Sequence, residues 1–378
     1  MVQTLFKKMD WLLFFFTLPI LGAGLVTMSS FLPKDGMVDG HLFLKQLLWI
    51  GVSLLVFFIF SFIDFRFLRR TDVLVALFVF FSCILILLFF VGNTINGSKS
   101  WFSLGGFSFQ PVDFMKVVVI LVLAKYFSRR HVEIAHMRHI FISGLYAIIP
   151  FILVALQPDF GSAIIIFLIW LGVSIVAGIS KKHLLLIFLV VMVATAGMWF
   201  FAFKPYQKER ILNFIHPLSD IRGSGYNAYQ STIAVGSGQI LGKGVGYGTQ
   251  SRLSFLPEYE TDFVFAAFSE EWGFVGSMLI LILFGLVIWR IIVNSMVGAT
   301  NFETLFGTGV AVLFMSHIFV NVGMNIGLLP VTGITLPLMS YGGSHLLAEF
   351  SALGILMGMR RYNRPAHRDD MKNEFLGI

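Results

Sequence analysis

Residues 204–262 read KPYQKERILNFIHPLSDIRGSGYNAYQSTIAVGSGQILGKGVGYGTQSRLSFLPEYETD, and this polar segment interrupts an otherwise strongly apolar chain. It contains charged side chains of both signs, prolines and a dense run of glycines, whereas apolar residues dominate before and after it. Connections between neighbouring helices commonly need only about 2–8 residues. A segment this long and this polar therefore indicates a site of chemistry, and Asp262, its last residue, is the first candidate for a catalytic group.

The composition is that of an integral membrane protein. Hydrophobic residues make up 57% of the 378 residues and charged residues only 12%, compared with roughly 25% charged residues in soluble domains. Apolar runs of about 20 residues, enough to cross a bilayer as a helix, recur along the chain. The net charge of +7 forms no exposed basic stripe, so we expect no nucleic-acid partner. The lone cysteine, Cys83, excludes an internal disulfide.

Ten apolar segments predict about ten transmembrane helices within one domain that covers residues 1–378. The segments are residues 11–32, 44–63, 72–92, 112–128, 138–157, 160–178, 183–203, 274–293, 304–325 and 344–360. None of them alternates polar and apolar residues as barrel strands do, so an all-α integral membrane fold is expected.

The basic residues predict the orientation of these spans. If the N-terminus is cytoplasmic, most of the 27 basic residues lie in cytoplasmic segments, and the short outer loops contain only Lys34, Lys45 and Lys99. Cytoplasmic loops are the ones enriched in Lys and Arg. We therefore expect both termini in the cytoplasm, a cytoplasmic tail at residues 361–378, and residues 204–262 as a large extracytoplasmic loop between helices 7 and 8.

Three further loops are expected on the same outer side. They are NTINGSKSWFSLGGFSFQPVDFMK at residues 93–116, QPDFG at 157–161 and GLLPVTGITLPLMSYGGS at 327–344. The last of them is rich in apolar residues as well as in prolines and glycines. We expect it to be packed into the protein at membrane depth, because irregular backbone is tolerated there only when it is buried in protein or lines a water-filled cavity.

Ionisable residues within spans or at their outer edges are candidates for function. Asp113 and Lys116 are three residues apart at the start of the fourth span, so they share one helical face, where they could bind a substrate or simply pair with each other. Asp159 lies in the gap between the fifth and sixth spans. It could cap the following helix or contribute to the site.

Glu258, Glu260 and Asp262 place three carboxylates within five residues. Crowded like charges raise the pKa of at least one of them, and a carboxylate poised in this way can accept a proton. An acidic start to the helix that follows explains the same residues through the helix dipole.

Two other patterns resemble binding motifs incompletely. The run GSGQILGKGVGYG around Lys243 has Ser237 and Gly244 at positions where a phosphate-binding loop requires glycine and Ser or Thr, which favours a lid or tight packing over a phosphate site. His345 and Glu349 are one helical turn apart and could bind a metal. No third ligand is evident, so a packed polar pair is favoured.

Five segments together resemble one known family. They are FSFQPVDFMK at 107–116, QPDFGSA at 157–163, KPYQKERILNFIHP at 204–217, GTQSRLSFLPEYETDFVFA at 248–266 and LLPVTGITLPLMSYGGS at 328–344. They are similar to motifs of the SEDS family, the bacterial shape, elongation, division and sporulation proteins. The resemblance covers about residues 10–360, and the KPYQKERI and GTQS segments are nearer to the RodA branch than to the FtsW branch.

The resemblance implies a ten-helix peptidoglycan glycosyltransferase in the bacterial cytoplasmic membrane. Such an enzyme polymerises lipid II on the outer face, embedded in membrane lipid, with a class B penicillin-binding protein as its partner. The family's essential aspartate falls on Asp262, the expected general base of an inverting transfer. The positions expected to bind substrate are Lys116, Asp113, Asp159, Arg210, Glu258, Lys243 and Ser344. No cofactor or metal ligand set is implied with certainty, and a divalent cation is left open.

The chain departs from the family pattern at four positions. Ser254 stands where an acidic residue is common, Glu260 where a histidine is usual, Asp113 in place of a glutamate and His345 in place of a serine. The first two change the charge around the expected base. Two other functions remain open, a flippase of the lipid-linked precursor and a non-catalytic scaffold of the wall-synthesis machinery, as does the choice between elongation, division and sporulation.

Overall fold

The computed structural model describes residues 9–30, 40–95, 98–104, 107–129, 137–201, 203, 205–216, 225–253 and 255–362. Lys204, Ser254, part of the polar segment at residues 217–224 and most of the expected cytoplasmic tail lie outside these residues.

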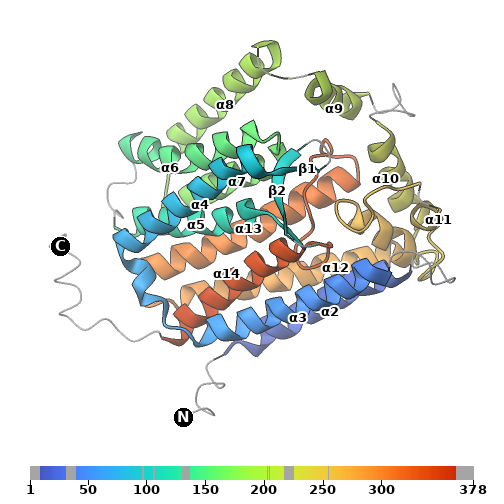
Figure 1. Ribbon diagram of the computed structural model, residues 1–378, viewed down its shortest axis with the longest axis horizontal. Coiled ribbons are helices and arrows are strands. Elements are labelled where there is room, and N and C mark those ends of the chain that lie inside the picture. Colours follow the sequence, from blue (N-terminus) through green and yellow to red (C-terminus); the bar gives the residue numbers. More distant parts are fainter. Residues whose placement is uncertain are drawn as a thin grey trace.

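Ten long helices make up the body of the molecule within the residues just given (Figure 1). They are α2 Trp11–Ser30, α3 Gly40–Phe62, α4 Thr71–Val91, α5 Pro111–Ser128, α6 Met137–Leu156, α7 Phe160–Ala177, α8 Lys181–Phe201, α12 Val264–Met296, α13 Asn301–Asn325 and α14 Gly343–Arg361. Within the described residues, eight helices are long and apolar enough to cross a membrane. The expected helical, multi-pass membrane fold is therefore confirmed.

The helices α5 and α14 are absent from those eight because they carry charged side chains in the interior of the bundle. Asp113 and Lys116 of α5 are buried, as are His345 and Glu349 of α14. A helix surrounded by protein need not be uniformly apolar, since its polar groups can find partners on neighbouring helices. By contrast, α8 has no buried residue and projects from the bundle in Figure 1.

The shorter elements lie in the connections. They are the 3₁₀ helix η1 Phe65–Arg69, the strands β1 Asn93–Ile95, β2 Ser98–Leu104 and β3 Phe107–Phe109, and the helices α9 Pro205–Ile215, α10 Tyr226–Ser237 and α11 Thr249–Arg252. The strands form an antiparallel sheet in the order β1-β2-β3, with Phe102 opposite Phe109. This sheet was not predicted from the sequence, because its strands are only three to seven residues long.

A kink at Gly273 divides α12. Its backbone angles, φ 66° and ψ −166°, are non-helical, and glycine adopts them without the steric penalty of a side chain. The glycine run takes up the interrupted backbone hydrogen bonds: Phe274 N–H donates to the Gln239 carbonyl at 2.8 Å and Val275 N–H to the Ile240 carbonyl at 3.1 Å. The run therefore packs tightly against α12, as the sequence favoured.

The kink also changes where this helix begins. The apolar segment predicted a span from residue 274, whereas α12 begins at Val264 with a buried first part that includes Glu270 and Glu271. Glu270 and Glu271 lie outside the predicted apolar segment, and the glycine run and α11 supply their partners.

Candidate active site

The pair Asp113 and Lys116 occupies the start of α5. Pro111 begins the helix, where its missing N–H costs nothing, so that Asp113 falls in the first turn and Lys116 one turn later. The Lys116 ammonium nitrogen lies 3.1 Å from Asp113 Oδ1, and both side chains are buried. Removing two charges from water is costly unless further hydrogen bonds compensate, so the surroundings of this pair decide what it can do.

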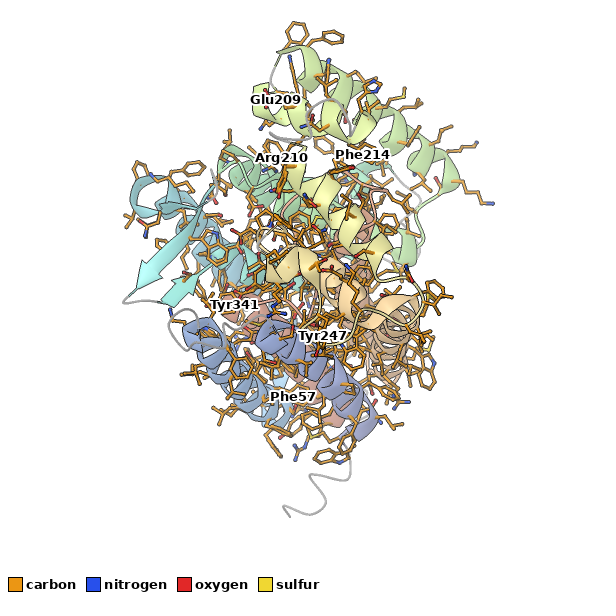
Figure 2. All side chains as sticks on the ribbon, turned by 90° about the vertical axis from the view of Figure 1, so that its right-hand side faces the viewer. Phe57, Glu209, Arg210, Phe214, Tyr247 and Tyr341 are labelled. Atoms are coloured by element: carbon orange, nitrogen blue, oxygen red, sulfur yellow. The ribbon has the colours of Figure 1, made fainter. Side chains whose placement is uncertain are left out.

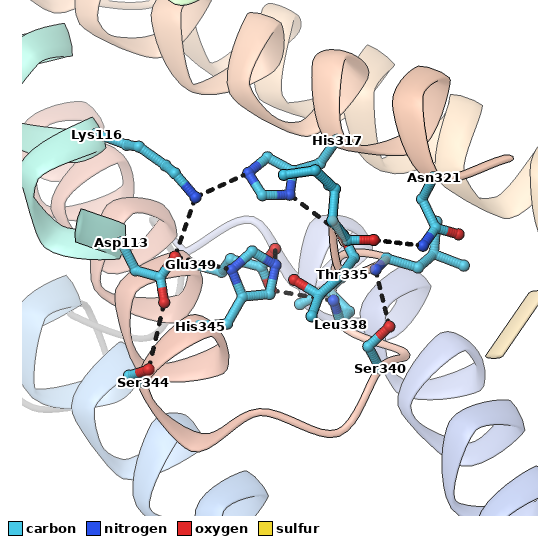
Figure 3. Close-up of polar contacts among 12 residues, drawn as sticks. Asp113, Lys116, His317, Asn321, Thr335, Leu338, Ser340, Ser344, His345 and Glu349 are labelled. Atoms are coloured by element: carbon cyan, nitrogen blue, oxygen red, sulfur yellow. Dashed lines mark hydrogen bonds and ion pairs between the residues drawn. The ribbon is translucent and has the colours of Figure 1, made fainter. Parts of the chain in front are cut away.

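His317 of α13 supplies one of these bonds (Figure 3). Its Nδ1 lies 3.2 Å from the Thr335 carbonyl oxygen, and its Nε2 lies 3.4 Å from the Lys116 nitrogen. A carbonyl only accepts hydrogen bonds and an ammonium only donates them. The ring therefore donates from Nδ1 and accepts at Nε2, so it is neutral and fixes the position of Lys116.

His345 of α14 lies between two carboxylates. Its Nδ1 is 3.5 Å from Asp113 Oδ1 and its Nε2 is 2.9 Å from Glu349 Oε1. These two contacts are ion pairs only when the ring is protonated. With Lys116, a protonated His345 makes two positive charges against the two negative charges of Asp113 and Glu349, and the buried cluster is then neutral. The expected pairing of His345 with Glu349 is confirmed.

Ser344 joins the same cluster, since its hydroxyl donates to Asp113 Oδ2 at 3.3 Å. The second oxygen of Glu349 accepts from the backbone N–H of Leu338 at 3.0 Å. These bonds attach the 327–342 loop and α14 to α5. Of the residues expected at the site, Asp113, Lys116 and Ser344 are thus in direct contact.

Asp159 caps α7, as the sequence allowed. Its Oδ1 accepts from Ser162 N–H at 3.0 Å, and its Oδ2 accepts from the Gln110 side-chain amide, also at 3.0 Å. Gln110 immediately precedes α5, so this carboxylate joins the starts of two helices. Burial raises the pKa of Asp159, and the negative charge of Asp113 acts in the same direction, against the hydrogen bond from Ser162 and the charge of Lys116.

Asp262 lies in the turn immediately before α12. Its backbone carbonyl oxygen accepts hydrogen bonds from the side-chain amides of Asn321, at 2.9 Å, and Asn325, at 3.1 Å, both in α13. Its side chain is partly exposed. Two side chains of α13 therefore fix the backbone at Asp262, while part of its own side chain remains accessible to solvent.

The surroundings of Asp262 favour a carboxyl group that exchanges a proton near neutral pH. Burial, followed by the negative charge of Glu258, raises the pKa of the Asp262 carboxyl to about 7. The positive charge of Arg210 opposes this rise, and the charge of Asp159 adds to it. A base with a pKa near the working pH is the one that general-base catalysis requires.

The sequence did not single out His317, Asn321 or Asn325. Besides holding Asp262, Asn321 donates to the Ile334 carbonyl at 2.6 Å, and Asn325 Oδ1 accepts from Ala266 N–H at 3.2 Å. The signal that could have identified them is their four-residue spacing, which places three polar side chains on one face of an otherwise apolar span.

The 327–342 loop packs against the turn that contains Asp262. Ile334, Leu336, Leu338 and Met339 are at most 2% exposed, whereas Leu328 is 68% exposed. The expectation that this apolar loop is buried in the protein therefore holds for its second half. The Ser340 hydroxyl donates to the Thr261 carbonyl at 2.6 Å. Loop and turn therefore form one unit.

The three remaining candidates lie on the polar segment. Arg210 is an exposed residue of α9, which Figure 2 shows at the end of the bundle that carries the polar segment. Glu258 is exposed and accepts a 2.9 Å hydrogen bond from the Thr261 hydroxyl. Both are close enough to influence the Asp262 carboxyl electrostatically.

Lys243 has a different set of partners. Its ammonium nitrogen lies 2.6 Å from Glu270 Oε1 and 2.9 Å from the Thr249 hydroxyl. Glu270 also accepts from the backbone N–H groups of Thr249 and Gln250. Lys243 thus helps to connect the glycine run and α11 to Glu270 of α12. A role for Lys243 in substrate binding remains a prediction.

Comparison with known proteins identifies the family. A family model described as cell cycle protein, for the FtsW, RodA and SpoVE proteins, matches residues 9–365. The chain is 35% identical over 360 residues to stage V sporulation protein E of Bacillus subtilis (strain 168), across 94% of this chain and 98% of that one. It is 36% identical over 291 residues to peptidoglycan glycosyltransferase MrdB of Escherichia coli (strain K12), across 76% and 78%.

Solved structures agree with this result. One described as "Structural coordination of polymerization and crosslinking by a peptidoglycan synthase complex" matches with a TM-score of 0.80 and 31% identity, over 94% of this chain and 99% of that one. The crystal structure of the rod shape determining protein RodA of Thermus thermophilus matches with a TM-score of 0.70 and 29% identity, over 94% and 98%. The chain therefore belongs to the FtsW, RodA and SpoVE family of cell cycle proteins, the family that its motifs resemble.

Proposed function

We propose that this protein is a peptidoglycan glycosyltransferase that polymerises lipid II into glycan strands during cell-wall elongation. The observation that carries the proposal is the partly exposed Asp262 carboxyl, whose pKa of about 7 suits a general base. The relatives named peptidoglycan glycosyltransferases support the reaction class.

In the proposed step, the hydroxyl oxygen of the acceptor sugar attacks the anomeric carbon of the lipid-linked donor. Asp262 accepts the hydroxyl proton as the new glycosidic bond forms. The bond between the anomeric carbon and the pyrophosphate oxygen breaks, and its electron pair leaves with the lipid pyrophosphate. One displacement of this kind converts an α-linked donor into a β-linked product.

The departing pyrophosphate requires positive charge, for which Lys116 and Arg210 are the candidates. A lysine ammonium has three N–H donors, and Asp113 and His317 take up two of those of Lys116. Its surroundings are buried, so its charge acts in a medium of low dielectric constant, where attraction is strong. Asp113 and Ser344 would orient Lys116, while Asp159, Glu258 and Lys243 would contact other parts of the substrates.

The membrane orientation and the partner belong to the same proposal. Lipid II is polymerised outside the bacterial cytoplasmic membrane, which requires the Asp262 end of the bundle to face outward and both termini to lie in the cytoplasm. A class B penicillin-binding protein is the proposed partner, supported by the similarity to a peptidoglycan synthase complex that coordinates polymerization and crosslinking.

The direct test uses purified protein and fluorescent lipid II, with and without the penicillin-binding partner, and resolves glycan strands on a gel. We expect strands from the protein and more of them with its partner. Movement of lipid II across liposome membranes without strand formation would indicate a flippase. The absence of both activities, with complex formation verified, would indicate a scaffold.

A further inference from the structure

A pocket of about 240 Å³ lies between α4, α5 and α6, which are neighbours in the bundle (Figure 1). Val75 and Phe78 of α4, Val122 of α5 and Tyr146 of α6 contribute to its apolar wall, and Lys125 and Arg129 of α5 also line it. Lys125 is twelve residues after Asp113 on the same helix, about 18 Å along its axis at 1.5 Å per residue. The pocket is therefore separate from the candidate active site.

Two of the lining residues, Lys125 and Arg129, are cations. They are four residues apart at the end of α5, a spacing that places them on one helical face. Thr71, the first residue of α4, also lines the pocket, so the positive end of that helix dipole adds to the charge of the cations. The nearest acidic residue of α4, Asp72, does not line the pocket and lies 3.6 Å from Arg70. The part of the pocket beside these cations is suited to an anion.

The helices around the pocket expose apolar side chains on the surface that a bilayer would cover. On α4, Val75, Val79 and Phe80 are 55%, 52% and 57% exposed, and Phe141 of α6 is 76% exposed. Because α4 is the most apolar of the candidate spans, its exposed face is suited to acyl chains. A ligand that suits both the cations and this apolar face has a negative head group and a hydrocarbon tail.

We propose that the pocket between α4, α5 and α6 is a binding site for an anionic glycerophospholipid of the surrounding membrane. The phosphate lies between Lys125 and Arg129, and the first part of one acyl chain packs along Val75, Phe78 and Tyr146. Basic pockets between membrane helices recognise anionic head groups in this way. The bound lipid fills the space between three helices, so it strengthens the packing of α4 and α6 against α5.

A titration of the purified full-length protein, followed by native mass spectrometry, tests this site. The probes are phosphatidylglycerol, which carries a net negative charge, and phosphatidylcholine, which does not. Wild-type protein should bind phosphatidylglycerol more tightly. Replacing both cations, Lys125→Gln with Arg129→Gln, should weaken phosphatidylglycerol binding about thirtyfold, since each cation near the head group contributes roughly fivefold. It should weaken phosphatidylcholine binding much less, because the choline group of that lipid already balances the charge of its phosphate.

A matched control removes two cations elsewhere. Lys181 and Lys182, exposed residues at the start of α8, are not among the pocket residues, and Lys181→Gln with Lys182→Gln should preserve the preference for phosphatidylglycerol. A second variant, Val75→Trp, fills the apolar part of the pocket from an exposed position. Val75→Trp should weaken the binding of both lipids. This result tests the site even if the Lys125 and Arg129 variant does not fold.

Three results would overturn the proposal. One is an unchanged preference for phosphatidylglycerol in the Lys125 and Arg129 variant. Another is a loss of this preference in the Lys181 and Lys182 control that equals the loss in the Lys125 and Arg129 variant. The third is binding of glycerol 3-phosphate as tight as that of phosphatidylglycerol, because a site for a soluble phosphate needs no acyl chain.

Discussion

The side-chain amide nitrogen of Asn321 lies 2.9 Å from the backbone carbonyl oxygen of Asp262 and 2.6 Å from that of Ile334. One side chain of α13 thus joins the turn that carries the proposed base to the buried second half of the 327–342 loop. Because the position of a base decides how well it reaches its substrate, Asn321 is expected to act as a positioning residue for Asp262.

The variant Asn321→Ala should reduce turnover by about ten- to hundredfold, since the Ile334 carbonyl loses this donor, the Asp262 carbonyl keeps only Asn325, and the turn can shift. The loss should fall on kcat more than on KM, which polymerisation rates at several lipid II concentrations would show. Asn301→Ala, at an exposed position at the start of the same helix, is the matched control. Equal kcat values for the two variants would mean that Asn321 does not position the base.

Lys116→Met should impair both stability and turnover. It leaves the buried Asp113 carboxylate without its nearest cation, and breaking a buried ion pair typically costs about 3–5 kcal/mol. The double variant Asp113→Asn with Lys116→Met removes both charges and should recover much of the thermal midpoint without recovering turnover. Normal polymerisation by the double variant would show that the pair is only structural.

The polymerisation rate should rise with pH and reach half of its maximum near pH 7. Asp262 accepts a proton only as the carboxylate, and its pKa is raised to about 7. Glu258→Gln removes a negative charge that raises this pKa and should move the midpoint to lower pH. Arg210→Gln removes an opposing positive charge and should move it to higher pH. Both shifts should be small, because Glu258 and Arg210 are exposed to solvent; shifts in the opposite directions would contradict the assignment.

The same pKa has a consequence for stability. A carboxyl group whose pKa is raised on folding stabilises the native state while it is protonated. Its contribution is therefore complete below its ordinary pKa of 3.8 and is lost as the pH rises through about 7. The difference in thermal midpoint between the protein and Asp262→Asn should change across this interval and be constant above it.

The proposed orientation can be tested by labelling single cysteines with a membrane-impermeant reagent in intact cells. In a Cys83→Ser background, a cysteine in place of Tyr247, which is 70% exposed, should react from outside. A cysteine in place of Lys182, at the start of α8, should react only after the cells are opened. The reverse pattern would place the candidate active site in the cytoplasm.

The apolar segments predicted the positions of the long helices well, because burial in lipid imposes a strong constraint on composition. The prediction was least accurate at α12, where the apolar segment began at residue 274 and left out Glu270 and Glu271. Their partners, including Lys243 and the N–H group of Gly246, come from a segment more than twenty residues earlier. No local pattern in the sequence reveals such a pairing.

The candidate site could be predicted only in part, for the same reason. Asp113 and Lys116 are neighbours on one helix, so their spacing alone indicated the contact. His317 and His345 reach that pair from two other helices, and Asn321 reaches Asp262 across 59 residues of sequence. These contacts arise from helix packing, which the order of residues in a single sequence does not determine.

The measurement that tests the central claim most directly is glycan strand formation from lipid II by purified Asp262→Asn protein. The substitution keeps the size of the side chain but removes its ability to accept a proton, and loss of a general base typically lowers the rate by about 10²- to 10⁴-fold. We predict that strands are close to undetectable while the variant still inserts in the membrane and still binds its partner. Strand formation at a near wild-type rate would contradict the assignment of Asp262 as the base.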